Sequence, residues 1–599
     1  MNEARAKTGD WISALPMWNL DDLYPGPQSR ELLDAIEGSQ CRIKDFEEAY
    51  KGKVAGLNGA AFGVSLRTYE SISETLGRVA SYAQLYHSED VVDPDRGQVY
   101  QNLIDQITQM SSRLIFFSLE INQLNDGDVD VLLADRVVAS YRPWIRDLRV
   151  FRDYQLSDEL ERLLHEKSVV GRTAWVRLFD ETEAALRCNI NGKTLRLTEA
   201  LSLFLDPKAE IRKRAGKAVS EALLDKLPLF AKITNTLAKD KQIEDDWRTY
   251  PQPVSARNLA NLVEDDVVEA LVTAVKSTYA ETAHRYYALK ARWLGKVKLD
   301  YWDRNAPLPE AVPEEIAWTE AKSIVLDAYQ TFSPQMAQIG RRFFDECWID
   351  AGSRSGKVSG AFSHPTVPSA HPFILLNYMG NPRDVSTLAH ELGHGVHQVL
   401  AADRGHLLAE TPLILAETAS VFGEMLTFQA LLKAQHDPRR RRILLAEKVE
   451  DMLNTVVRQI AFYEFERIVH DERKRGELTA DRLCQIWLCV QKESLGPAFE
   501  FSDEYRLYWS YIPHFLHTPF YVYAYAFGDC LVSALYEVYE NSLVDNFQDR
   551  YLDMLRAGGT LRHKELLAPF GLKANDSDFW KKGMNRIIKL IDQLEETTL

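Results

Sequence analysis

One short motif in the sequence has residue types and spacing that could bind a metal ion and activate water. His390, Glu391 and His394 form the pattern H-E-x-x-H. On a helix, residues four positions apart lie on the same face, so both imidazoles can reach a single ion. Zinc binds neutral imidazole nitrogen well, and a catalytic zinc site keeps one coordination position open for water. The Glu between the imidazoles could accept a proton from that water, so the motif predicts metal-dependent hydrolysis.

The residues around the motif predict the helix that must position it. Asn381-Pro382 is typical of an N-cap residue followed by proline in the first turn. Apolar residues recur at helical spacing from Val385 to Leu400 and form one stripe, with the imidazoles roughly opposite. Gly405 follows as a candidate stop signal. We therefore expect an amphipathic helix that carries the metal ligands on its polar side.

A catalytic zinc usually takes three protein ligands, so the sequence must supply one more. His397 lies near the same face, but the extended pattern H-E-x-x-H-x-x-G-x-x-H fails at this residue, and we interpret His397 as structural or supporting. Glu417 is the better candidate, because an antiparallel return of the chain would bring the start of the next predicted helix beside the imidazoles. Glu424, two turns later on the same face, could hydrogen-bond a ligand imidazole and fix its tautomer.

Composition limits the classes of protein that fit. The formal net charge of -16 argues against a general binder of nucleic acids or anionic membranes. No apolar run is long enough to span a membrane, and the first residues lack the apolar region of a signal peptide. The six Cys residues are scattered without a C-x-x-C pair, which favours a reducing compartment. We therefore expect a cytoplasmic protein.

The length of 599 residues predicts several domains or one large helical body. Helical spacing dominates, and Asn191-Gly192 between short β-prone runs predicts a hairpin. We place a domain boundary near residue 200, which gives an N-terminal helical domain (1–200) and a catalytic domain (201–599). Residues 351–369 are rich in Gly and Pro and could form a surface loop, a mobile flap or a strand edge, and residues 372–378 predict a buried strand.

The metal motif also carries a resemblance to a known family. With H-E-L-G-H at 390–394 followed by E-T-A-S-V-F-G-E at 417–424, the chain resembles the thimet oligopeptidase family of zinc metallopeptidases, most closely its oligoendopeptidase F branch. The similarity spans nearly the whole chain, because four further stretches fit that branch: 18–24, 257–261, 302–308 and 519–523.

The resemblance implies a mainly α-helical, two-lobed zincin body with a deep central channel and a few short strands. Such a channel would admit short unfolded peptides and exclude folded proteins. His390, His394 and Glu417 would correspond to the ligands of one Zn2+ ion, and Glu391 to the general base. The expected activity is hydrolysis of internal bonds in short peptides, without nucleic-acid or membrane partners.

Family members also place a late His and Tyr over the scissile carbonyl, where they can donate hydrogen bonds to the developing oxyanion. The corresponding segment here is 512–525, but it lacks the Gly-rich loop of thimet-type members. We assign these roles to His514 and Tyr523, with Tyr521 and Tyr525 as alternatives. Aromatic residues at every second position could instead belong to a buried strand or a packed helix.

Two other functions compete with the oligoendopeptidase. A zinc metallocarboxypeptidase or dipeptidyl carboxypeptidase on a related helical zincin fold would need a basic group that anchors the substrate's C-terminus. A helical peptide-binding protein with a vestigial metal site would not need Glu391. Structural zinc is normally closed by four protein ligands, often Cys, and no Cys lies near the motif.

Overall fold

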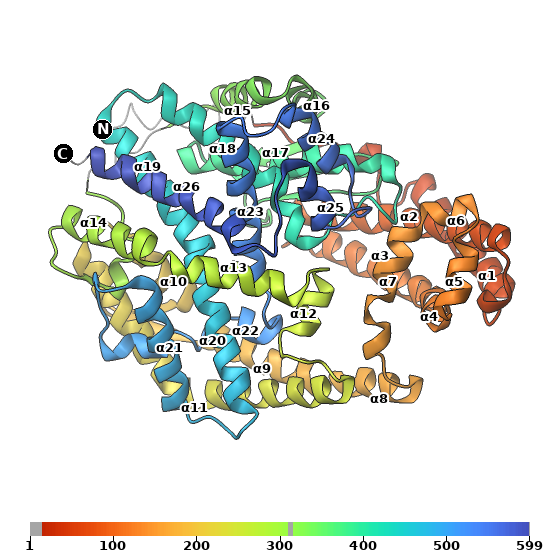
Figure 1. Ribbon diagram of the computed structural model, residues 1–599, viewed down its shortest axis with the longest axis horizontal. Helices are drawn as coiled ribbons and strands as arrows, with labels where there is room; N and C mark the ends of the chain where they lie inside the picture. Colours follow the sequence, from red (N-terminus) through yellow and green to blue (C-terminus); the bar gives the residue numbers. More distant parts are fainter. Residues whose placement is uncertain (1–14, 310–314, 598–599) are drawn as a thin grey trace. The chain divides into compact units, whose positions relative to one another are not determined.

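The computed structural model describes residues 15–309 and 315–597, and helices predominate in these ranges (Figure 1). This confirms the prediction of a mainly helical fold with a few short strands. The chain falls into two compact units, each built from three segments. Unit 1 comprises 1–152, 313–433 and 544–570, and unit 2 comprises 153–312, 434–543 and 571–599. Each unit combines segments far apart in sequence, and the division expected near residue 200 stays a prediction.

Unit 1 contains the predicted metal helix. Its α-helices are α1 (Arg30–Tyr50), α2 (Gly59–Ser88), α3 (Pro94–Ser112), α4 (Ile115–Gln123), α5 (Asp126–Leu132), α6 (Arg136–Ser140), α7 (Arg142–Leu148), α15 (Trp318–Phe332), α16 (Pro334–Asp345), α17 (Pro382–Ala401), α18 (Leu413–Ala434), α24 (Phe547–Arg556) and α25 (His563–Leu567). Side-chain caps start several of them, since Ser29, Asn58 and Asp93 each accept a backbone N–H of the first turn.

A three-stranded sheet accompanies these helices. Its strand order is β4 (Ile349–Gly352), β6 (Phe373–Tyr378) and β5 (Phe362–His364), with β4 parallel and β5 antiparallel to the central strand. The central strand is almost entirely buried, which confirms the strand predicted at 372–378. An edge strand, β5, lies within the Gly- and Pro-rich stretch, so part of that stretch is a strand edge and not a simple surface loop.

Unit 2 is also mainly helical. Its α-helices are α8 (Asp158–Ser168), α9 (Arg172–Ala185), α10 (Leu197–Ser202), α11 (Ala209–Arg248), α12 (Ser255–Ala260), α13 (Asp265–Ser277), α14 (Arg285–Trp293), α19 (Pro438–Thr455), α20 (Val457–Arg473), α21 (Ala480–Leu495), α22 (His514–His517), α23 (Tyr523–Glu540) and α26 (Ser577–Glu596). A π-helical turn at Ala280–His284 precedes α14, and β3 (Leu299–Asp300) pairs in parallel with β7 (Phe499–Glu500).

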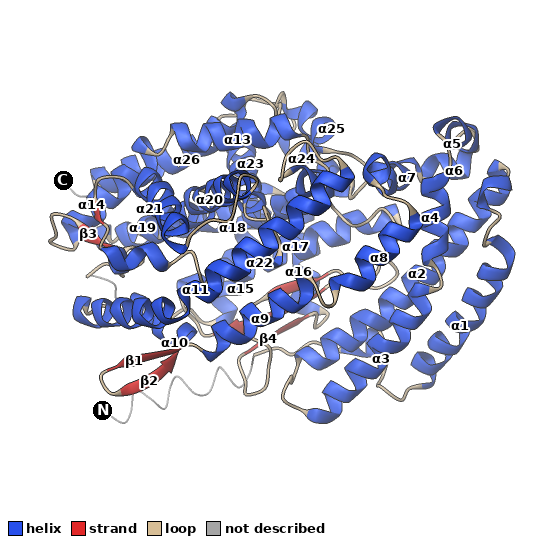
Figure 2. Cartoon of the chain, turned by 90° about the horizontal axis from the view of Figure 1, so that it is seen from below, coloured by secondary structure: helices blue, strands red, loops and turns tan. Residues whose placement is uncertain are grey.

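The predicted hairpin is present in unit 2 as β1 (Arg187–Ile190) and β2 (Lys193–Arg196), drawn in red in Figure 2. Asn191 and Gly192 connect the strands, and both have positive φ, as a two-residue hairpin turn of type I′ requires. Among the described helices of both units, none is long and apolar enough to cross a membrane.

Candidate metal centre and active site

The N-terminus of α17 is fixed by the cap that the sequence predicted. The Asn381 side chain accepts the backbone N–H of Asp384 at 3.1 Å, and the Asp384 carboxylate accepts the N–H of Asn381 at 3.1 Å and of Met379 at 2.7 Å. This reciprocal arrangement is a capping box, with Pro382 in the first turn. The helix therefore starts at a defined residue, which sets the positions of the side chains two turns later.

Glycines allow α17 to approach its neighbours closely. A Cβ atom on Gly393 would lie 2.7 Å from the Cα of Ser420 and closer still to the Ala419 carbonyl oxygen, both backbone atoms of α18. On another face, a Cβ on Gly395 would overlap the ring of Phe343 in α16. The close α17–α18 approach brings the H-E-x-x-H motif beside the first turns of α18.

The two imidazoles of the motif converge on Glu417. The Nε2 atoms of His390 and His394 lie 3.3 and 3.4 Å from the Glu417 Oε2 atom, and one ligand atom from each residue lies within 4.8 Å of the others. Tetrahedral zinc with bonds of about 2.0–2.1 Å separates its ligand atoms by about 3.3–3.4 Å. The separations of Glu417 Oε2 from the two imidazoles therefore match those of ligands on a single zinc ion, and the three residues together could hold one.

Further contacts orient these ligands. The Glu424 Oε2 atom lies 3.4 Å from His390 Nδ1, which leaves Nε2 toward Glu417, as the sequence analysis anticipated. Ser420 donates its hydroxyl to Glu417 Oε2 at 2.7 Å. We did not predict the contact between Ser420 and Glu417 from the sequence, although residues three positions apart on a helix are neighbours and the spacing could have indicated it.

The electrostatics of the cluster favour a bound cation. Burial alone would lower the pKa of His390, but the carboxylates of Glu424, Glu417 and Glu391 raise it to about 9. Burial alone would raise the pKa of Glu417, but His394 and His390 lower it to about 2. The carboxylates thus stabilise a positive charge within the cluster, and a bound divalent cation would provide such a charge in place of protonated imidazoles.

Glu391 lies beside the ligands and is buried, with a relative exposure of 8%. Burial raises the pKa of its carboxyl group, while His390 and His394 oppose that rise and a hydrogen bond from the Ser363 backbone opposes it further. Ser363 belongs to β5 and is tied to α17, because its hydroxyl donates to Gln398 Oε1 at 2.9 Å. The edge strand therefore lies next to the expected general base.

His397 has a structural position. It is buried, and its Nε2 atom lies 3.1 Å from the Thr411 hydroxyl while its ring also hydrogen-bonds the backbone of Ala416. These contacts join α17 to the start of α18. Burial lowers the pKa of His397 to about 4, so the ring is neutral at pH 7. This agrees with its interpretation as a supporting residue.

The two residues expected at the oxyanion lie in unit 2, and the structure separates them. His514 Nε2 lies 3.3 Å from the Tyr525 hydroxyl, and its ring stacks near Tyr521 with centroids 6.3 Å apart. Tyr523 is fully buried, and its hydroxyl accepts the Asn261 amide at 2.8 Å. The position of Tyr523 does not support the role assigned to it. The rings of Tyr521 and Tyr525 are instead in contact, with centroids 5.3 Å apart, while the side chain of Tyr523 lies in the core.

Family models match most of the chain. The model of peptidase family M3 matches residues 202–586, and the model of oligopeptidase F matches residues 120–187. Both matches confirm the resemblance to the oligoendopeptidase F branch.

Individual relatives agree with the family models. Oligopeptidase PepF of Bacillus subtilis is 26% identical over 606 residues, which cover 98% of this chain and 88% of the relative. An oligoendopeptidase F homolog of Borreliella burgdorferi is 26% identical over 555 residues, 91% of each chain.

Solved structures share the fold. A protein described as a peptidase from Chlamydophila abortus has a TM-score of 0.86 at 22% identity, covering 97% of this chain and 98% of its own. Oligoendopeptidase-F from Enterococcus faecium has a TM-score of 0.71 at 23% identity, covering 95% and 99%. With the family model spanning more than half of the sequence, the chain belongs to peptidase family M3 and is a metallo-oligopeptidase.

Proposed function

We propose that the protein is a zinc-dependent oligoendopeptidase of the cytoplasm that hydrolyses internal bonds of short unfolded peptides. The observation that carries this proposal is the convergence of ligand atoms of His390, His394 and Glu417 to within 4.8 Å of one another, beside the buried carboxyl group of Glu391. Membership of family M3 supports the substrate class. The scattered Cys residues without a C-x-x-C pair support the cytoplasmic location, and the net charge of -16 supports the absence of nucleic-acid partners.

The residues divide the chemistry between them. A zinc ion held by the three ligands would supply a Lewis acid and lower the pKa of a coordinated water to about 7. Glu391 takes the proton from the attacking water and delivers it to the leaving amine. Burial raises the pKa of Glu391, which strengthens the carboxylate as a proton acceptor. Glu424 holds the tautomer of His390.

His514 and the tyrosines beside it would stabilise the oxyanion. The 3.3 Å contact between His514 and the Tyr525 hydroxyl supports Tyr525 in this role, with Tyr521 as the second donor. Donors of this kind stabilise charge that develops only in the transition state, and loss of one costs about 10²–10³ in kcat. Tyr523 would support this segment from the core.

Mass spectrometry of a length-graded peptide mixture tests the proposal. The wild-type enzyme should cut internal bonds of short peptides and leave a folded protein intact. Glu391→Gln preserves the shape of the side chain but removes the base, so it should retain zinc and lose about 10²–10⁴ in kcat. A Glu391→Gln variant with full activity would refute the assignment of the base. Trimming confined to peptide C-termini would refute the endopeptidase in favour of the carboxypeptidase, and absence of cleavage in zinc-supplemented buffer would favour the binding protein.

A further inference from the structure

Two arginines of unit 2 line the same two small cavities. Arg304 follows β3, and Arg458 lies in the first turn of α20. They share a cavity of ≈ 40 Å³ with Trp487, Tyr505 and Tyr511, and a second of ≈ 10 Å³ with residues that include Gln491. All of these residues belong to unit 2.

Neither guanidinium forms an ion pair with a carboxylate in the part of the chain that the structure describes. The acidic group that acts on Arg304 is Glu450, which already contacts the Lys290 ammonium and accepts the Tyr286 hydroxyl at 2.7 Å. Lys290 also donates to the Arg304 carbonyl at 2.8 Å. Glu450 therefore faces both Lys290 and Arg304 and can balance only one of their charges, while Arg458 has no ion pair with a carboxylate among the described residues.

The nearest other charged groups do not remove this excess. Arg212 pairs with Asp303 at 2.8 Å, and Lys296 contacts both Asp303 and Asp300. These four groups carry two positive and two negative charges. Burying a charge without a partner is unfavourable, so a buried cation without a carboxylate favours the binding of an anion.

The polar atoms around the cavities are mostly hydrogen-bond donors. Arg458 Nε, Trp487 Nε1 and Gln491 Nε2 are shielded from solvent and have no acceptor within the described residues. Asn305 Oδ1 is an acceptor without a partner in the same lining. A site with donors in excess and a positive charge favours an anion, because charge-assisted hydrogen bonds are the strongest available to these groups.

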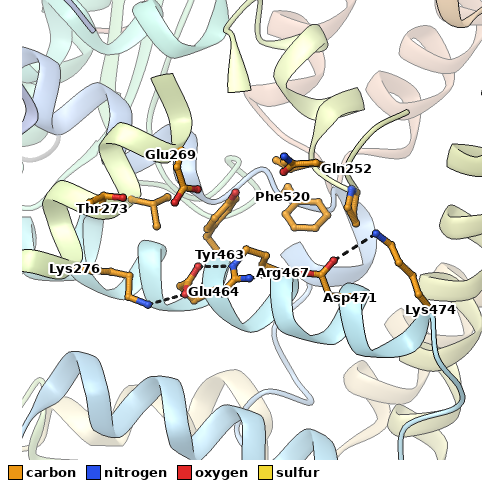
Figure 3. A pocket seen from close by; sticks show the side chains of 13 residues that line it. Gln252, Glu269, Thr273, Lys276, Tyr463, Glu464, Arg467, Asp471, Lys474 and Phe520 are labelled. Atoms are coloured by element: carbon orange, nitrogen blue, oxygen red, sulfur yellow. Dashed lines mark hydrogen bonds and ion pairs between the residues drawn. The ribbon is translucent and has the colours of Figure 1, made fainter. Parts of the chain in front are cut away.

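A larger cavity of unit 2 shows the opposite arrangement. This cavity, of ≈ 540 Å³, is lined by three basic side chains that each meet a carboxylate (Figure 3). Lys276 and Arg467 contact Glu464 at 2.7 and 2.8 Å, and Lys474 contacts Asp471 at 3.5 Å. Each basic side chain in the lining of the larger cavity is thus paired with a carboxylate, whereas Arg304 and Arg458 are not.

We propose that Arg304 and Arg458 bind a small monovalent anion, chloride under physiological conditions, in the cavity that they share. A space of ≈ 40 Å³ accommodates an ion of halide size or a few waters, and it excludes a peptide carboxylate with its chain or a phosphate ester. The residues that would bind the anion all belong to unit 2, and none of them is a ligand of the proposed metal centre.

The position of the site connects it to His514. Residues of α20 and α21 line the cavity together with Tyr505 and Tyr511. Only two residues separate Tyr511 from His514 in the sequence. Burial lowers the pKa of His514, and the charges of His517 and Arg458 lower it further. An anion beside Arg458 would stabilise the segment that carries His514 and offset part of that charge. Only this consequence rests on the proposed function; anion binding itself does not.

Thermal unfolding of the full-length enzyme tests binding without reference to activity. At constant ionic strength, replacing sodium gluconate with sodium chloride should raise Tm saturably by about 2–5 °C. Arg458→Gln should abolish the chloride-dependent rise in Tm. Arg467→Gln is the control, because Arg467 lines the larger cavity and is already paired with Glu464, and this variant should show the same rise in Tm as the wild type. Equal Tm values in chloride and gluconate at every concentration would overturn the proposal.

Crystals of the wild-type enzyme soaked in sodium bromide provide a second test that needs no variant. The proposal expects an anomalous peak in contact with the guanidinium groups of Arg304 and Arg458. Ordered water in this cavity, with no anomalous peak, would overturn it even if Arg458→Gln failed to fold.

Discussion

Gly393→Ala tests how the metal ligands of two helices are held together. Gly393 lies between His390 and His394 on α17, at the point where this helix meets the backbone of α18. The added methyl group would lie 2.7 Å from Ser420 Cα, whereas ordinary van der Waals contacts begin at 3.4 Å. The obstacle is backbone, which cannot turn aside as a flexible side chain can.

The helices must therefore separate by about 0.7–1 Å to admit the methyl group, a typical overpacking distortion. Metal–ligand distances tolerate about 0.2 Å, so this displacement of Glu417 exceeds the tolerance several-fold. We expect metal affinity to fall by at least 10–100-fold, as for loss of supporting contacts, and kcat/KM to fall by about 100-fold or more. Overpacking should also cost about 1–3 kcal/mol of stability.

The assay combines metal analysis after dialysis against a weak chelator with kcat/KM for an internally quenched peptide. Gly38→Ala is the matched control, because Gly38 lies in α1 and a Cβ there would meet no atom within 4 Å. This control should keep full activity and gain about 0.5–1 kcal/mol of stability. Full metal content and wild-type kcat/KM in Gly393→Ala would refute the reasoning.

Three further predictions follow from the same structure. Glu424→Gln removes the carboxylate at His390 Nδ1 and should weaken zinc binding by about 10–100-fold in chelator competition; unchanged affinity would contradict its role. Burial raises the pKa of Glu466 to about 8, so the native state holds a proton that the unfolded state releases, and stability is lost as pH rises from about 4.5 to 8. Glu466→Gln should therefore exceed the wild type in stability by up to ~4 kcal/mol at pH 8.5 and by little at pH 5, whereas parallel profiles in denaturant titrations would oppose this assignment. A strong chelator should abolish peptide cleavage and lower Tm, with both restored by zinc; activity that survives complete metal removal would count against a metal-dependent mechanism.

Local sequence signals predicted the elements that hold the metal ligands. Asn381-Pro382 identified the start of α17, and the spacing of His390 and His394 needed only the geometry of one helix. Glu417 required one further assumption, an antiparallel return of the chain, and the structure shows it 3.3–3.4 Å from both imidazoles. These residues lie close together in sequence, so few alternatives for their arrangement existed.

Features that depend on distant segments could not be predicted in the same way. The direction of Tyr523 depends on where α23 begins and on Asn261, which lies in a different part of the sequence. The division into two units depends on contacts between segments far apart in sequence, because the chain passes from one unit to the other five times. Likewise, the charge excess at Arg304 and Arg458 appears only when β3, α20 and their neighbours are assembled, since each Arg alone resembles a surface residue.

Metal content of matched variants tests the central claim most directly. The wild type and Glu391→Gln should each bind about one zinc ion per chain, while Glu417→Ala should bind little after the same dialysis, because a catalytic zinc site needs three protein ligands. Peptide cleavage should appear in the wild type alone. Full zinc occupancy in Glu417→Ala, or cleavage at the wild-type rate by Glu391→Gln, would contradict the account.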